Sequence, residues 1–158
     1  MRRADHRRFA LFAGFALGTL LAPAPARAAC TISTVGVAFG AYNSLAATPD
    51  DGTGTVEAAC HPSDQSPIVE FGSGQSGTAL ARRMSGGTDM LDYNLYTDVN
   101  RTIVWGDGTS GSTAVTLTDG IVTSGTRRFS RTIYGRIPAG QQVGEGVYTD
   151  TLMVTITF

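Results

Sequence analysis

The chain has 158 residues, of which 42% are hydrophobic and 16% are charged, and its formal net charge is −1. All twelve basic residues are arginine, and five of them lie in the first 27 positions. From residue 29 onward the chain has seven arginines and twelve acidic residues. An excess of acidic side chains repels phosphate, which argues against nucleic acid or anionic membranes as partners.

The first 28 residues have the three-part pattern of a secretory signal peptide. A start with four arginines precedes an uncharged, mostly apolar run from Phe9 to Leu21, and Ala26-Arg27-Ala28 supplies the small residues that a signal peptidase reads. A run of 13 residues is too short for a bilayer span, which needs about 20. A lipid anchor at Cys30 would need an aliphatic residue where Arg27 stands. We therefore expect residues 1–28 to be cleaved and residues 29–158 to be exported as one domain without a membrane anchor.

Cys30 and Cys60 are the two cysteines of the chain. An even pair in a chain exported to an oxidising compartment predicts a disulfide. The bond would close a loop of about 30 residues and stabilise the fold by roughly 3–4 kcal/mol. Two reactive thiols are the alternative, but the spacing is not C-x-x-C and no activating base lies nearby in the sequence.

Beyond residue 30, segments with period-two alternation recur every ten to twenty residues, bounded by Gly, Asp, Ser and Asn, and no helical periodicity is present. This pattern is typical of an all-β sandwich. The expected strands are Ile32–Phe39, Thr55–Cys60, Ile68–Phe71, Tyr93–Thr97, Thr102–Trp105, Thr113–Leu117, Arg131–Ile137 and Val147–Phe158.

The last expected strand has the clearest alternation. One face is rich in threonine and is expected to meet solvent. Asp150 interrupts the other, inward face, and we expect it at the wet entrance of the strand. The remaining inward residues are apolar: Tyr148, Leu152, Val154, Ile156 and Phe158.

A glycine-rich segment from Gly72 to Gly77 matches G-x-G-x-x-G, with Asp92 twenty residues beyond its start. A dinucleotide site of this kind needs a helix whose N-terminus faces the pyrophosphate. Only Thr78 to Ser85 follows before two more glycines, which is too short for that helix. We interpret the segment as a loop between strands and expect no cofactor.

The inventory of residues for catalysis is small. His61 is the one histidine beyond the expected signal peptide, and no carboxylate is placed to orient it as a base. Asp89, Asp92 and Asp98 fit solvated loop ends better than a pair of glycosidase acids. Asp107 and the Asp50-Asp51 pair lack the pattern of a calcium loop. We therefore expect neither enzymatic activity nor a bound metal, and an exported hydrolase is the less favoured alternative.

Several short motifs occur in an order that resembles the spore coat protein U domain, the subunit domain of Csu-type archaic chaperone–usher pili. The resemblance extends over nearly all of residues 29–158. Its motifs are Cys30 before a strand, Phe39-Gly40-x-Tyr42, Cys60, Arg83-Met84, Leu91-x-Tyr93-x-Leu95-Tyr96-x-Asp98, Trp105-Gly106, Tyr134-Gly135-Arg136-Ile137 and Gly146-x-Tyr148-x-Asp150-Thr151-Leu152-x-Val154-Thr155.

The resemblance implies an immunoglobulin-like sandwich that lacks its final strand and carries an apolar groove. A periplasmic chaperone fills the groove first, and at an outer-membrane usher the N-terminal segment of the next pilus subunit replaces it. On this basis Leu152, Val154 and Ile156 are expected to line one wall of the groove and to face Val35 and Val37 of the first strand. The expected route leads through the periplasm to the cell surface.

One departure from the family pattern concerns the donor segment. Polymerising subunits carry an alternating segment before the first cysteine, whereas cleavage after Ala28 leaves only Ala29 before Cys30. The chain is therefore expected to accept a donor strand without giving one, as a structural or adhesive subunit at the tip of a pilus. A stand-alone secreted coat protein of a cell or spore surface is the alternative.

The signal peptide makes a direct prediction. Exported protein should begin at Ala29, because the peptidase reads the small residues at positions 26 and 28. N-terminal sequencing of the secreted material checks this, and secreted protein that retains Met1 would contradict it.

Overall fold

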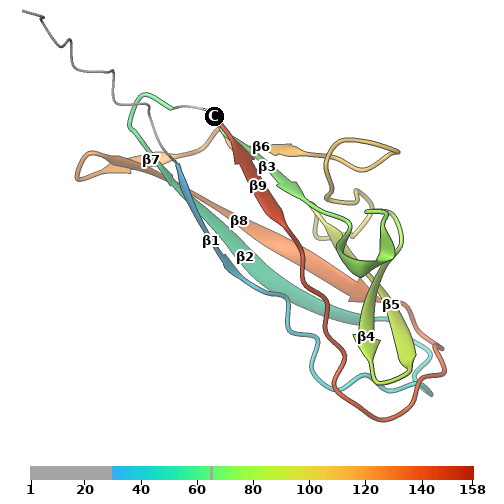
Figure 1. Ribbon diagram of the computed structural model, residues 1–158. Helices are drawn as coiled ribbons and strands as arrows, with labels where there is room; N and C mark the ends of the chain where they lie inside the picture. Colours follow the sequence, from blue (N-terminus) through green and yellow to red (C-terminus); the bar gives the residue numbers. More distant parts are fainter. Residues whose placement is uncertain (1–29, 65) are drawn as a thin grey trace, which may run out of the picture.

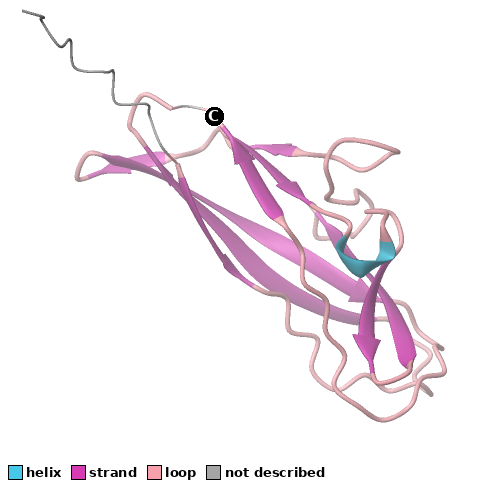
Figure 2. Ribbon diagram, in the orientation of Figure 1, coloured by secondary structure: helices cyan, strands magenta, loops and turns pink. Residues whose placement is uncertain are grey.

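A computed structural model describes residues 30–64 and 66–158 of the chain. Strands and loops make up these residues, with one short 3-10 turn, η1 (Gly74–Ser76), and no α-helix among them (Figure 2). The part of the chain described contains no helix long and apolar enough to span a bilayer. The expected signal peptide lies outside the described residues.

Nine strands in the described residues form two antiparallel sheets, which lie as two layers in Figure 1. The smaller sheet has the order β6 (Val115–Thr116), β3 (Ile68–Phe71) and β9 (Val154–Thr157). The prediction of an all-β sandwich is confirmed. The larger sheet runs in the order β1 (Thr31–Val35), β2 (Asp50–Cys60), β8 (Thr126–Ile137), β5 (Asp89–Tyr96) and β4 (Arg82–Gly86), and β7 (Ile121–Thr123) also pairs with β8.

Alternation along the two longest strands builds the core. In β2 every second residue from Gly52 to Cys60 is buried, and in β8 Phe129, Ile133, Gly135 and Ile137 are buried on one face, which the half-buried Arg131 interrupts. Trp105 packs edge-on against Phe71 of the smaller sheet, with 4.9 Å between ring centroids, and its indole N–H donates to the carbonyl of Val69. The buried residues from the larger sheet include Val56, Ala58, Leu91, Leu95, Phe129, Ile133 and Ile137.

A fully buried arginine connects the two sheets. Arg82 lies on β4, and its guanidinium donates to the carbonyls of Phe71 and Gly72 at the end of β3, to the carbonyl of Trp105 and to Asn94 Oδ1, at 2.8–3.0 Å. Burial lowers the pKa of this guanidinium, but arginine remains charged at any physiological pH. Neutral oxygens thus hold a buried cation, and removing it would take a donor from each of them, leaving Asn94 Oδ1 with the N–H of Leu95 alone.

The disulfide between Cys30 and Cys60 is present, as predicted. It links the residue before β1 to the last residue of β2, the strand with which β1 pairs. Cys60 is buried, and Cys30 packs against the core. The bond therefore fastens the outermost strand of the larger sheet to its single neighbour.

The predicted strands agree with the structure to different degrees. The prediction for β3 is exact, and β2 and β8 both begin five residues before their predicted starts. The regular strand expected over Val147–Phe158 is confined to Val154–Thr157, and Thr102–Trp105 forms isolated bridges in place of a strand. β4 and β7 were not predicted. β4 begins with two arginines, and all three residues of β7 are exposed.

The neighbouring residues Arg82 and Arg83 allow a matched test of the buried cation. Arg82→Leu should lower the free energy of unfolding by at least about 3 kcal/mol, because several buried oxygens lose their donor. Arg83→Leu should cost under about 1 kcal/mol, since Arg83 is exposed and makes a surface ion pair with Asp92. Urea unfolding of the two variants measures the difference, and equal losses would contradict the connecting role of Arg82.

Candidate functional site

β1 and β9 are two of the edge strands of the sheets. β1 pairs with β2 alone, and β9 pairs with β3 alone. The two edges run along the same side of the molecule (Figure 1). Each leaves a row of backbone N–H and C=O groups free, which is a template for another extended chain.

Hydrogen bonds in the segment before β9 indicate which backbone groups are free. Gly72 donates its N–H to the carbonyl of Met153, and Thr149 exchanges two hydrogen bonds with Ser85 of β4. The backbone groups of successive residues in an extended chain point alternately to its two sides. The groups of residues 150, 152 and 154 therefore point away from the sheet, toward the open side.

A cleft of about 280 Å³ lies between the two edges. One wall consists of Val37 and Phe39, in the segment that follows β1, and the other consists of Leu152 and Val154. The cleft thus exposes part of the apolar interior between the sheets. Side chains of the core line its floor: Phe71, Met84, Tyr93, Leu95 and Ile133.

Glycines determine the shape of the first wall. A Cβ on Gly54 would lie 2.5 Å from the carbonyl oxygen of Val35, so the segment after β1 passes directly over the inner face of β2. Val37 and Phe39 then pack over Gly135 of β8, where any side chain would meet both of them. The chain after β1 therefore leaves the sheet and enters the interior.

This crossing places one predicted groove residue outside the cleft. Val35 was expected to face the groove together with Val37, but Val35 is 69% exposed and does not line the cleft. The alternation changes phase at Gly36, because the chain leaves the sheet there. Thr34 and Val37 line the cleft on either side of this position.

The structure brings together three of the five predicted groove residues, Val37, Leu152 and Val154. Ile156 lies further along β9, paired with Val69, and packs half-buried against the core outside the cleft. Sequence reasoning missed Phe39 and the residues of the floor. Two signals were available for Phe39: the alternation of the expected strand Ile32–Phe39 places it on the same side as Val37, and a family motif begins at Phe39.

One end of the cleft is polar. The hydroxyl of Tyr93 donates to Asp150 Oδ2 at 2.8 Å, and both residues line the cleft. Burial raises the pKa of Tyr93, and the hydrogen bond to Asp150 raises it further. Asp150 Oδ1 accepts from the backbone N–H and the side-chain amide of Gln75 and from the N–H of Thr151. Asp150 was expected at a wet entrance; it lies half-buried in the wall of the open cleft and accepts four hydrogen bonds within the protein.

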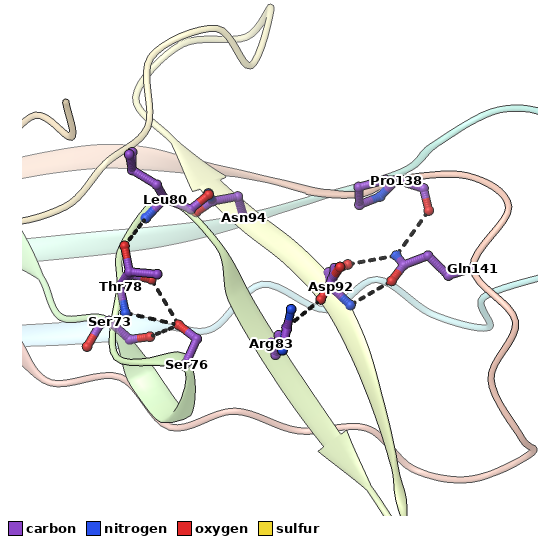
Figure 3. Close-up of polar contacts among 9 residues, drawn as sticks. All are labelled: Ser73, Ser76, Thr78, Leu80, Arg83, Asp92, Asn94, Pro138 and Gln141. Atoms are coloured by element: carbon purple, nitrogen blue, oxygen red, sulfur yellow. Dashed lines mark hydrogen bonds and ion pairs between the residues drawn. The ribbon is translucent and has the colours of Figure 1, made fainter. Parts of the chain in front are cut away.

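A second hollow of about 690 Å³ adjoins the cleft and is lined by the segments 37–44 and 143–148. Side-chain hydrogen bonds hold the second segment in place. Gln141 exchanges two hydrogen bonds with the backbone of Asp92 and donates to the carbonyl of Pro138 (Figure 3). Tyr42 accepts from the N–H of Gln141 and so ties the two loops together. The hollow shares Val37, Phe39, Met84 and Tyr148 with the cleft.

The other residues considered for chemistry lie apart from the cleft. His61 Nδ1 contacts the Ser63 hydroxyl in an exposed loop, Asp92 pairs with Arg83, and Asp98 accepts three hydrogen bonds within its own turn. No group of three or more potential metal ligands occurs in residues 30–64 and 66–158. The glycine-rich segment from Gly72 forms the η1 turn between two strands, as interpreted from the sequence.

Two glycines beside the cleft provide a test of its first wall. Gly54→Ala should destabilise the protein by about 1–3 kcal/mol and displace the wall, because the new Cβ would overlap backbone atoms. Gly36→Ala, where nothing lies within 4 Å, should be neutral or stabilising by up to about 1 kcal/mol. Urea unfolding and amide hydrogen exchange of residues 35–39 measure both effects. If the two variants behaved alike, the crossing over β2 would be wrong.

Comparison with known proteins gives relatives of two kinds. The chain is 40% identical over 88 residues to Protein U of Myxococcus xanthus, a match that covers 54% of this chain and 45% of that protein. The fold is similar to that in the crystal structure of the CsuC–CsuE chaperone–tip adhesion subunit pre-assembly complex from the archaic chaperone–usher Csu pili of Acinetobacter baumannii. That likeness has a TM-score of 0.54 at 18% identity and covers 83% of this chain and 40% of the other.

The likeness to a pilus subunit supports the expectation of an immunoglobulin-like sandwich. The family model of the Spore Coat Protein U domain matches residues 16–155, which is most of the chain. The resemblance inferred from the ordered motifs is therefore confirmed: this chain belongs to the Spore Coat Protein U domain family.

Proposed function

We propose that this protein is a structural subunit of a surface pilus that a chaperone–usher pathway assembles, and that it accepts a donor strand in the cleft between β1 and β9. The observation that carries the proposal is the cleft itself, an apolar opening bordered by two unpaired sheet edges. Membership of the family and the likeness in fold to a chaperone-bound pilus subunit support it.

An extended segment suits this cleft better than a compact ligand. The free backbone groups of β9 can form a ladder with a new strand, which gives affinity whatever its sequence. Alternate side chains of that strand would point between the sheets, toward Val37, Leu152 and Val154. Their burial would remove from water the apolar surface that the cleft exposes.

The proposed partners follow from this mode of binding. A periplasmic chaperone would occupy the cleft after export, and an outer-membrane usher would exchange it for a segment of a neighbouring pilus subunit. The protein would pass through the periplasm and end at the cell surface. No catalytic step belongs to this function, and the absence of enzymatic activity stays a prediction.

We also propose a terminal position, at the tip of the pilus. A donor segment that spans the cleft takes on the order of ten residues at about 3.3 Å each. The predicted cleavage site leaves Ala29 alone before Cys30, which the disulfide holds. Such a subunit would accept a donor strand and offer none, which suits the tip of a pilus. The proposed tip position therefore depends on cleavage at the predicted site.

A stand-alone coat protein is the second candidate. The name of the family, Spore Coat Protein U domain, favours it. The two functions differ in one property of the purified protein. A pilus subunit needs affinity for a separate strand, whereas a coat protein of this fold needs none.

A pair of adjacent residues tests the proposed cleft. Leu152→Asp should weaken binding of a ten-residue peptide of alternating valine and threonine by at least about a hundredfold, because strand insertion would bury an unpaired charge. Met153→Asp introduces the same charge at a neighbouring residue that is 76% exposed, and it should bind the peptide like the unaltered protein. Fluorescence anisotropy of labelled peptide measures both affinities.

Two results would argue against the pilus function. The unaltered protein could be a stable, complete sandwich with no affinity for any strand peptide, which would favour the coat-protein function. Alternatively, Met153→Asp could weaken binding as much as Leu152→Asp, which would mean that the peptide does not bind in the cleft.

A further inference from the structure

We propose that Asp150 selects a small hydroxyl-bearing residue, serine or threonine, at one fixed position of the strand that enters the cleft. This inference rests on the proposed function and adds a rule for the sequence of the partner. It starts from the inward-facing residues beside the cleft, of which Tyr148, Leu152, Val154 and Ile156 are uncharged and Asp150 alone carries a charge.

The carboxylate of Asp150 has room for one more hydrogen bond. Its Oδ1 atom accepts three donors, from Gln75 and Thr151, whereas Oδ2 accepts one, from Tyr93. Oδ2 is therefore the carboxylate oxygen with capacity for a further hydrogen bond. Asp150 is half-buried and lines the cleft, so a strand inserted there would cover this oxygen and exclude water from it.

The position of this carboxylate is fixed. Thr149 is bonded to Ser85 through both backbone groups, and Gln75 clamps Asp150 from the η1 turn. The backbone of Gly74 lies so close that a Cβ there would overlap the Asp150 carboxylate. Asp150 can therefore not turn outward to meet solvent when a strand enters, and the incoming residue must satisfy it.

The spacing of the wall residues sets the position of the hydroxyl. Val154, Leu152 and Asp150 follow one another at intervals of two, so the facing residues of the new strand are also two apart. The first two of these positions meet apolar side chains and suit valine or leucine. The third meets Oδ2, and an apolar residue there would cover this oxygen and leave the Tyr93 hydroxyl as its one donor.

Other side chains fit this third position less well. An acidic residue would bring two carboxylates together without water between them. A long cationic residue would have to lie in the same region as Arg82, a buried cation whose charge already interacts with Asp150. A short hydroxyl donates one hydrogen bond, adds no charge and leaves the hydrogen bonds of Asp150 unchanged.

The test compares serine with alanine, which differ only in the hydroxyl. In the peptide of alternating valine and threonine, each valine is replaced in turn by serine and by alanine, and Kd is measured with the exported protein. At one position the serine peptide should bind roughly tenfold tighter than the alanine peptide, and aspartate at that position should weaken binding by about a hundredfold. At the other valine positions serine should bind no better than alanine.

The variant Asp150→Leu should abolish the advantage of serine at that one position, while Asp119→Leu, on the loop before β7 and away from the cleft, should retain it. The comparison of serine with alanine on the unaltered protein stands even if Asp150→Leu fails to fold. Equal affinities of serine and alanine at every position would overturn this inference and leave the proposed function intact. If no peptide binds, the proposed function fails and this inference fails with it.

Discussion

The free edge of β9 is the constraint on which the rest of this structure depends. A strand with one unpaired side has to meet water or another chain, and here that side borders an opening into the apolar interior. A complete sandwich would close such an opening with a strand of its own. In this fold the described strands leave it open, so the two sheets must be held in place by something other than a strand between them.

Two features far apart in the sequence hold the strands in place, one within the larger sheet and the other between the two sheets. The disulfide fastens β1 to β2, and Arg82 joins β4 to the end of β3 and to Trp105. Both act locally and need no strand in the cleft. An arginine suits this purpose because its planar guanidinium donates in several directions at once, and carbonyl oxygens from separate segments meet on it. The core can therefore stay organised while one side of it is exposed.

The sequence predicted what local patterns encode. The disulfide, the all-β class and the bounds of β3 follow from cysteine count and alternation, and the ordered motifs identified the family. It failed where contacts between distant segments decide the outcome. Val35 and Val37 alternate as a regular strand would, yet the chain crosses β2 between them. Gly54, about twenty residues away in the sequence, allows this close approach, and local alternation carries no information about it. β4 was missed because Arg82, a core residue, reads as a surface charge in the sequence.

At position 150, stability and specificity favour different residues. An apolar residue there would bury more surface and would need no partners, so stability alone does not explain a carboxylate in this position. Alternating apolar residues give a strand affinity but fix its register weakly, because a shift by two residues restores the same pattern. One polar position in an otherwise apolar wall removes that degeneracy, since in only one register does a polar residue of the inserted strand lie opposite it. If the cleft accepts a strand, the carboxylate that Tyr93 and Gln75 hold in place is the feature that can tell one register from the next.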